Sequence, residues 1–223
     1  MNKNFGFQLG HPEIHLSGYH QESSAFFHMC WEYLGRALAA ICLACFLPIF
    51  GMIWLWMKLF DPGPMFFKQQ RPGYQGQQFT IYKIRTMQIG AEKKTALGTQ
   101  NDAPEVTRLG MILRKLKIDE APQLLNIVKG DMVIVGPRPI PIPLDAELRK
   151  GIPGFSMRYN VKPGLTSVGQ ICVNDNALGD ALIKDWKLRF EGELHYIRNR
   201  SVHYDCIMVL MTTAYVIRKT FAR

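Results

Sequence analysis

Residues 37–57 read ALAAICLACFLPIFGMIWLWM, and the architecture of the protein starts from this stretch. It contains no charged side chain, and Arg36 and Lys58 stand at its two ends. Its length matches the roughly 20 apolar residues that cross the hydrocarbon core of a bilayer. Pro48 lies near the middle and Gly51 follows it, so a straight helix is not expected. The sequence therefore predicts a membrane segment with a break or kink.

Two topologies fit this segment. A kinked helix can cross the bilayer, or a helix-break-helix can enter one leaflet and return to the same face. Composition alone favours crossing, because spanning helices tolerate proline. An excess of basic residues after the segment predicts a cytoplasmic location for that end. These residues are Lys58, Lys68, Arg71, Lys83 and Arg85.

The overall charge points to an anionic partner. The chain has 223 residues with 27 basic and 18 acidic side chains, a net charge of +9. That length suits one domain with a real core plus one appended element. The partner could be nucleic acid, phospholipid or a phosphorylated small molecule. We do not expect nucleic acid, because the basic residues are scattered and no known nucleic-acid-binding module is present.

The cysteines and the N-terminal region carry weaker signals. Five cysteines are an odd number and no cleavable signal sequence is visible, which favours a reduced, cytoplasmic compartment. Cys42 and Cys45 have C-x-x-C spacing, but no second pair completes a zinc site. Residues 1–28 are polar and lack firm periodicity, and we interpret residues 1–35 as a polar leader.

The sequence after the apolar segment predicts an α+β, predominantly helical domain. Asp61-Pro62-Gly63-Pro64 ends the first helix. Two short strands then flank an RPGYQG turn, and a third strand covers MVIVG. Further helices are expected at 109–116, 119–128, 144–150, 181–196 and 201–218, with a turn at 161–165. Residues 206–217 are uncharged but too short to cross a membrane, so they predict either a core helix or a helix on the membrane surface.

The stretch KIDEAPQLL, residues 117–125, places Asp119 and Glu120 side by side. On a helix their side chains diverge by roughly 100°, unlike the facing carboxylates of a glycosidase. The pair suits a division of labour, in which one carboxylate reacts and its neighbour holds a divalent cation. Pro122 favours the first turn of a helix, with Asp119 at the N-cap. Locally, a simple helix cap is the plainer interpretation.

Four basic residues strengthen the functional interpretation. Lys83 and Arg85 alternate on one predicted strand and so share a face. Arg114 precedes Asp119 by five residues, and Arg138 lies between two prolines. Arginines on rigid backbone suit bidentate contacts with phosphate oxygens, although each alone could be an ordinary surface charge. Together they indicate a phosphorylated substrate near a membrane.

The order of the motifs resembles the bacterial sugar transferases, the monotopic polyprenyl-phosphate glycosyl-1-phosphate transferases. The matching stretches are LFDPGPMFFKQQRPGYQGQQFTIYKIRTM (59–87), TRLGMILRKLKIDEAPQLLNIVKGDMVIVGPRP (107–139), VKPGLTSVGQI (161–171) and YIRNRSVHYDCIMVLMTT (196–213). With the apolar segment they cover residues 36 to about 218.

The resemblance implies a two-step transfer of a sugar 1-phosphate from a nucleoside diphosphate sugar, such as a UDP-sugar, to polyprenyl phosphate. It implies Asp119 as the nucleophile and Glu120 as the ligand of a Mg²⁺ cofactor. It assigns the substrate phosphates to Lys83, Arg85, Arg114 and Arg138, and a supporting role to Asp205. Membrane phospholipids are expected partners, and a homodimer is allowed.

The resemblance also reverses the prediction for topology. It implies a re-entrant segment at residues 36–60, broken at Pro48, with both ends cytoplasmic at the bacterial inner membrane. Residues 61–223 then form a compact cytoplasmic catalytic domain with membrane-surface helices and an amphipathic C-terminal helix. The chain departs from the family at Leu47, where serine is frequent, and at Glu105, where arginine is frequent.

Two alternatives belong to other classes of protein. The first is a membrane-tethered module that binds a nucleotide sugar without catalysis. The second is a basic scaffold at the membrane surface. An intact Asp-Glu pair accompanied by Arg114 and Arg138 is more than a binding module needs, so the sequence favours the enzyme.

Overall fold

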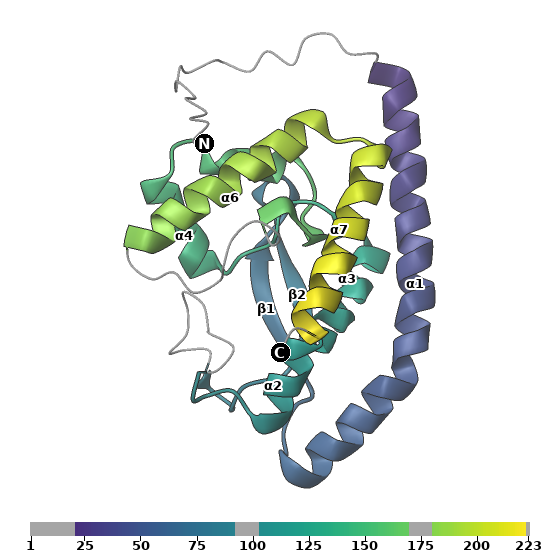
Figure 1. Ribbon diagram of the computed structural model, residues 1–223, viewed down its shortest axis with the longest axis vertical. Coiled ribbons are helices and arrows are strands. Elements are labelled where there is room, and N and C mark those ends of the chain that lie inside the picture. The colour runs from purple at the N-terminus through teal and green to yellow at the C-terminus, as the bar shows by residue number, and fades with distance from the viewer. Residues whose placement is uncertain (1–20, 92–102, 170–179, 222–223) are drawn as a thin grey trace.

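The computed structural model describes residues 21–91, 103–169 and 180–221. Its first helix, α1 (Gln21–Phe60), is 40 residues long and runs along one side of the molecule (Figure 1). α1 changes direction in its C-terminal part, and Pro48 lies inside that half of the helix. Proline removes a backbone donor and clashes with the preceding turn, which bends a helix. The predicted kink is therefore present as a bend within one helix.

Helix α1 begins at Gln21, within the range predicted as a polar leader. The indole Nε1 of Trp31 donates a 2.9 Å hydrogen bond to Asp205, and Glu32 forms an ion pair with Lys162. These contacts attach the N-terminal turns of α1 to the rest of the protein. The first 20 residues of the predicted leader lie outside the described residues.

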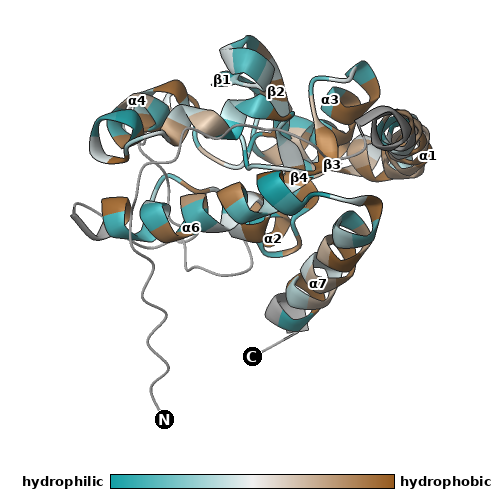
Figure 2. Ribbon diagram, turned by 90° about the horizontal axis from the view of Figure 1, so that it is seen from above, coloured by the Kyte–Doolittle hydropathy of each residue, from teal (hydrophilic) through white to brown (hydrophobic). Residues whose placement is uncertain are grey.

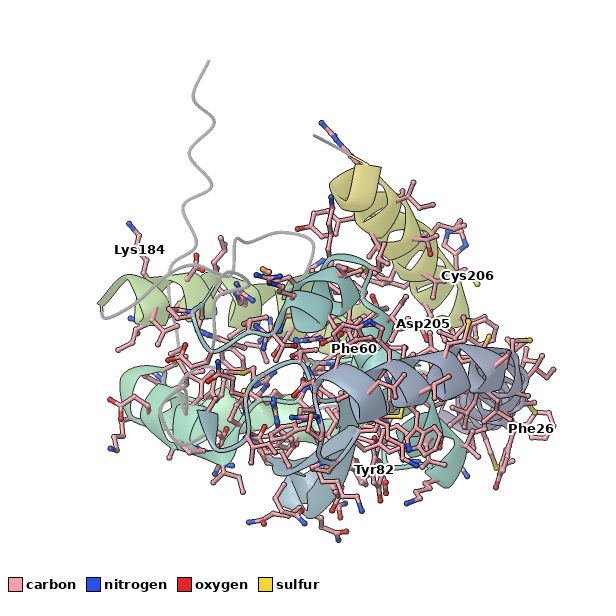
Figure 3. All side chains as sticks on the ribbon, turned by 90° about the horizontal axis from the view of Figure 1, so that it is seen from below. Phe26, Phe60, Tyr82, Lys184, Asp205 and Cys206 are labelled. Carbon is pink, nitrogen blue, oxygen red and sulfur yellow. The ribbon has the colours of Figure 1, made fainter. Side chains whose placement is uncertain are left out.

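Most of the apolar surface of α1 faces outward. Residues His28–Phe60 are long and apolar enough to cross a membrane, and only 17% of their most apolar window is buried. Phe26 and Phe60, labelled in Figure 3, are both exposed near its two ends. Two parts of α1 pack inward: Ala39 meets Ile127 and Met132, and Phe50, Ile53 and Met57 meet Ile84. A helix that leaves so much apolar surface uncovered is typical of a membrane segment.

The first two strands form an antiparallel hairpin. β1 (Phe66–Pro72) pairs with β2 (Gln78–Ile84) across the short 3-10 helix η1 (Tyr74–Gly76), as predicted. The fully buried Asn126 fixes α3 (Leu124–Lys129) against this hairpin. Its side chain donates to the Thr80 carbonyl at 2.7 Å and accepts from the Tyr82 amide at 3.2 Å.

Three short helices follow the hairpin and build the region of the carboxylate pair. They are α2 (Arg108–Lys115), the 3-10 helix η3 (Ile118–Gln123) and α3 (Leu124–Lys129). The prediction of one helix from Asp119 was wrong in this detail. Asp119 is not an N-cap but lies within η3, because Lys117 adopts a left-handed conformation with φ of 59° and starts a new turn there.

A second, smaller sheet holds the loop that follows the pair of Asp119 and Glu120, which we call the dyad. β3 (Val133–Val135) pairs in parallel with β4 (Gly164–Thr166), which was predicted as a turn. The two backbones approach so closely that a Cβ atom at Gly164 would lie 2.1 Å from the Gly136 nitrogen. Glycine is therefore required where the two segments touch.

The helices after β3 complete the described part of the domain. α4 (Ile142–Gly151), the 3-10 helix η4 (Phe155–Asn160) and α6 (Asp180–Asn199) pack around Leu148, Phe155 and Phe190. α7 (Val202–Phe221) projects from the body on the side that also carries α1 (Figure 2). Its Met208 is buried while Leu210 is 70% exposed, so α7 is not a fully packed core helix. The fold is mostly helical with a few short strands, as predicted.

The cysteines do not form disulfides in the described part of the chain. Cys30, Cys42, Cys45 and Cys206 are free and exposed. Cys172 lies outside the described residues.

Candidate active site

Asp119 and Glu120 lie at the junction of η3 with strand β2. The left-handed Lys117 turns the chain immediately before them, and Pro122 lies within the same 3-10 helix. Asp119 is only 8% exposed. A buried carboxylate needs compensation, so the residues around the pair determine its charge state.

Glu120 is held by two cations from different elements. Lys83 of β2 lies 3.0 Å from Oε1. Arg138, in the loop after β3, donates through Nη2 to Oε1 and through Nη1 to Oε2 at 3.3 Å. Burial would raise the pKa of Glu120, but Arg138, Lys83 and Lys117 hold it well below its ordinary value. Glu120 is therefore ionised and fixed in a bidentate contact.

Asp119 has the opposite electrostatic surroundings. Burial, followed by the neighbouring charge of Glu120, raises the pKa of Asp119, while Lys83, Lys117 and Arg114 act against that rise. Its Oδ1 atom is buried without a hydrogen-bond partner. Neighbouring carboxylates with different protonation behaviour are a usual feature of sites that divide chemical roles. Asp119 therefore differs from Glu120 in having a carboxylate oxygen that no side chain or backbone group engages.

Arg114 lies beside the pair on α2. Its Nε donates a 2.9 Å hydrogen bond to the Thr86 hydroxyl. Burial lowers the pKa of Arg114, and the charges of Asp119 and Glu120 oppose this. The structure thus brings together Lys83, Arg114 and Arg138 around the two carboxylates, as the sequence predicted.

Arg85 has other partners, so its predicted place among the phosphate-binding residues is not supported by its contacts. Its guanidinium donates to the Pro64 carbonyl at 3.0 Å and pairs with Asp61 Oδ1 at 3.1 Å. Both partners lie just after α1. The predicted strand was expected to carry both Lys83 and Arg85, but β2 ends at Ile84, so Arg85 lies just beyond it. Only Lys83 contacts the Asp119–Glu120 pair in the described structure.

Asp205 lies where α7 approaches α1 (Figure 3). It accepts from Trp31 of α1, and its Oδ1 lies 2.8 Å from the Tyr196 hydroxyl of α6. That hydroxyl is also 3.0 Å from the Val135 carbonyl. Asp205 therefore lies at a junction of three helices, and its predicted supporting role in the site stays a prediction.

Three charged residues near the site were not identified from the sequence. Arg71 of β1, Arg158 of η4 and Glu193 of α6 contact the backbone of Arg138 or Pro139. For Glu193 a signal existed, because it occupies the stripe of Trp186 and Phe190 at helical spacing, where an apolar residue is expected. Arg71 and Arg158 show no comparable pattern.

The donor set fits a magnesium ion only together with substrate phosphates. Mg²⁺ prefers oxygen ligands and is often held by one or two carboxylates plus phosphate oxygens. Glu120 and the unpartnered Oδ1 of Asp119 supply such oxygens. Within the described residues no three side chains of the His, Cys, Asp or Glu type gather to form a complete protein cage. Glu120 would have to share its charge between the ion and Arg138.

Comparison with known proteins agrees with this arrangement. Residues 27–219 match the family described as bacterial sugar transferase. The chain belongs to this family. The matched range includes η3 and strand β2, which position the carboxylate pair, and the loop that carries Arg138.

Named relatives in this family transfer different sugars. The UDP-glucose:undecaprenyl-phosphate glucose-1-phosphate transferase of Caulobacter vibrioides is 38% identical over 78% of this chain and 64% of its own length. The Escherichia coli protein of the same name is 37% identical over 78% of this chain and 37% of its own length. The UDP-N-acetylgalactosamine-undecaprenyl-phosphate N-acetylgalactosaminephosphotransferase of Aeromonas hydrophila is 35% identical, over 78% and 40%. The chain thus spans from 37% to 64% of the length of these relatives.

Proposed function

We propose that the protein transfers a sugar 1-phosphate from a UDP-sugar to undecaprenyl phosphate or a similar polyprenyl phosphate, and so starts the assembly of a lipid-linked glycan. The observation that carries the proposal is the buried pair of Asp119, with a free oxygen, and Glu120, held by Lys83 and Arg138. The printed names of the relatives supply the donor and acceptor classes. Because those names include two sugars, the transferred sugar stays open.

In the first step, a carboxylate oxygen of Asp119 attacks the phosphorus that carries the sugar. A bond forms between that oxygen and phosphorus, and the bond from phosphorus to the bridging oxygen breaks. The electron pair of the broken bond leaves with the nucleoside monophosphate. The attack brings negative charge toward a negatively charged pyrophosphate, so cations at Lys83, Arg114 and Arg138 lower the barrier.

In the second step, an oxygen of the polyprenyl phosphate attacks the same phosphorus. The bond to Asp119 breaks, and the carboxylate is restored. A covalent intermediate lets a water-soluble donor and a lipid acceptor visit one small site in turn. The site therefore never has to hold both substrates at the same time.

Magnesium is part of this proposal, with Glu120 as its protein ligand. When bound, it would supply positive charge against the substrate phosphates. The residues of the chain perform the remaining tasks: Asp119 reacts, Lys83 and Arg138 fix Glu120, and Arg114 keeps positive charge beside the nucleophile.

We further propose that α1 is a re-entrant membrane helix, with the catalytic domain on the cytoplasmic face of the inner membrane. The support is the bend in α1, its outward apolar surface, and the basic residues that follow it. α2 adds exposed apolar side chains at Met111, Ile112 and Leu116. A helix with such a face suits the boundary between headgroups and acyl chains.

The decisive experiment follows the covalent intermediate. The membrane-bound protein is incubated with Mg²⁺ and a panel of UDP-sugars, without lipid acceptor. The expected result is release of UMP and a phosphosugar adduct on Asp119, seen by intact-protein mass spectrometry. Asp119→Asn should lose the adduct and slow release by roughly 10³-fold or more. Glu147→Gln, which alters an exposed carboxylate paired with Lys150, is the control.

Two results would reject the proposal. UMP release by Asp119→Asn at the wild-type rate would remove Asp119 from the chemistry. Binding of a UDP-sugar by the unaltered protein with no UMP release from any member of the panel would favour the inactive binding module.

A further inference from the structure

The backbone of the loop that carries Arg138 has few hydrogen-bond donors, although the Pro137 carbonyl accepts from the Gly164 amide of β4 at 3.0 Å. Pro137 and Pro139 flank Arg138, and proline has no backbone N–H. The amide of Arg138 is therefore the one donor among these three residues. A guanidinium that must hold Glu120 bidentately needs a firmly fixed backbone, and the loop cannot supply that by itself.

A buried ion pair fixes this backbone on both sides of Arg138. Glu193 Oε1 accepts from the Arg138 amide at 3.3 Å, and Arg158 Nη2 donates to the Arg138 carbonyl at 2.6 Å. Arg158 and Glu193 also pair with each other at 2.9 Å, and both side chains are 2% exposed. One peptide donor and one peptide acceptor are thus clamped by a single pair from η4 and α6.

Arg71 adds a third contact from the opposite side. Its Nη1 donates to the Pro139 carbonyl at 2.6 Å, while Nε and Nη2 donate to Gln69 Oε1 at 3.0 and 2.7 Å. Gln69 therefore orients the guanidinium toward the loop. Arg71 lies on β1, so the hairpin that carries Lys83 also holds the loop that carries Arg138.

Stability alone gives no reason for this arrangement. Removing two charges from water costs several kcal/mol each, and well-packed apolar residues often replace a buried ion pair without loss. The pair also leaves Arg158 Nε and Nη1 and Glu193 Oε2 without hydrogen-bond partners. What an apolar pair could not do is hold the amide and the carbonyl of Arg138.

We propose that Arg158, Glu193 and Arg71 are positioning residues that fix the Arg138 backbone, and that they act on the reaction only through Arg138. We call this set the Arg138 clamp. The inference rests on the proposed transfer reaction. It extends the catalytic arrangement to three side chains that need not touch substrate.

The test asks whether the clamp acts through Arg138. Two clamp variants are made, Arg71→Met and the double variant Arg158→Met with Glu193→Leu, each in the wild-type and in the Arg138→Ala background. Single-turnover UMP release gives the rate constants. With Arg138 present, each variant should lower kcat/KM by about tenfold or more, the usual effect of losing a supporting contact. With Arg138 replaced, the same change should cost less than about twofold, because nothing is left to position.

Arg149→Met is the matched control. Arg149 pairs with Asp145 and lies over the Tyr159 ring, and the described structure shows no contact between it and the Arg138 loop. It should not change kcat/KM in either background. Arg71→Lys retains the charge and one donor, and it should recover part of the activity lost in Arg71→Met.

The outcomes distinguish the clamp from the transfer reaction. Equal losses in both backgrounds, or no loss with Arg138 present, would overturn the clamp while leaving the transfer reaction intact. Absence of UMP release from the unaltered protein would instead overturn the proposed function. Arg71 is partly exposed, so its variant keeps the inference testable even if the double variant fails to fold.

Discussion

Asp119 and Glu120 are adjacent in the chain but differ in what surrounds them. Glu120 has two cationic partners, whereas Asp119 has a buried oxygen with none. A buried carboxylate oxygen without a hydrogen-bond partner is poorly stabilised in the folded protein. In the proposed reaction the site keeps Glu120 for binding and Asp119 for attack.

A stability measurement can test the free-energy cost of burying the Asp119 carboxylate. Burial raises the pKa of Asp119 above that in the unfolded chain, so ionisation of this group destabilises the fold at neutral pH. We expect Asp119→Asn to raise the free energy of unfolding by about 1 kcal/mol at pH 7.5. The gain should vanish as the pH falls below the unfolded carboxyl pKa, where both states are protonated. Denaturant unfolding in detergent between about pH 3 and pH 8 measures it, and a variant less stable than wild type at pH 7.5 would contradict it.

The pH dependence of turnover gives a second test at this scale. Asp119 must be ionised to attack, so kcat/KM should rise with pH through its raised pKa. Lys83 lowers that pKa. Lys83→Met should therefore move the acid limb of the profile to higher pH, as well as weaken binding.

Lys129→Met is the control for this shift. Lys129 is exposed, and its ammonium group donates at 3.0 Å to the hydroxyl of Tyr82. Tyr82 is the residue that precedes Lys83 in the chain. It does not contribute to the causes that shift the pKa of Asp119. A profile for Lys83→Met that coincides with that of Lys129→Met would show that Lys83 does not tune the nucleophile.

At the scale of elements, Asp205 joins three helices. It accepts hydrogen bonds from Trp31 of α1 and Tyr196 of α6, and it lies in the first turn of α7. We expect Asp205→Ala to lower the free energy of unfolding by about 1–3 kcal/mol, because two donors lose a buried acceptor. The turnover of the folded fraction should stay within a few-fold of wild type.

Trp31→Phe separates the two bonds of this junction. It removes only the indole donor, so it should cost less stability than Asp205→Ala, and the two changes should not be additive. Thermal unfolding combined with UMP release measures both properties. A large loss of turnover at unchanged stability would place Asp205 in the chemistry instead.

Several elements could be predicted from the local sequence, and others could not. The hairpin, α2, α4, α6 and α7 were predicted, because periodicity and turn residues mark them. β4 was missed because Pro163-Gly164 resembles a turn, and only the partner strand β3 turns that segment into a strand. The 3-10 form of η3 was missed because it depends on the left-handed Lys117.

The same distinction applies to the site residues. Asp119, Glu120, Lys83, Arg114 and Arg138 were found from motif order and do gather in the structure. Arg85 was predicted to join them because its alternation with Lys83 on a strand would place both side chains on the same face. That alternation could not reveal that the Arg85 guanidinium forms an ion pair with Asp61. Arg158 was missed because its role depends on a long-range ion pair with Glu193.

At the scale of the whole molecule, both ends of α1 should face the cytoplasm. A single cysteine placed within residues 1–20, in a chain whose native cysteines are replaced, should react with a membrane-impermeant reagent only in inside-out vesicles. Replacing Pro48 with alanine should straighten α1 and shift part of the population toward labelling from the outside. Labelling of the parent chain from the outside alone would establish a spanning helix.

Strand β2 and the residue that follows it link the C-terminal end of α1 to the carboxylate pair. Lys83 contacts Glu120. Arg85, two residues later, donates a hydrogen bond to the Asp61 carbonyl, just after the end of α1. If α1 lies in the membrane as proposed, the reacting carboxylate has a fixed height above the acyl chains. A polyprenyl phosphate can then present its headgroup at that height while its tail remains in the hydrocarbon. Turnover with the lipid acceptor should accordingly vary with the thickness of the host bilayer, whereas formation of the adduct from the water-soluble donor should not.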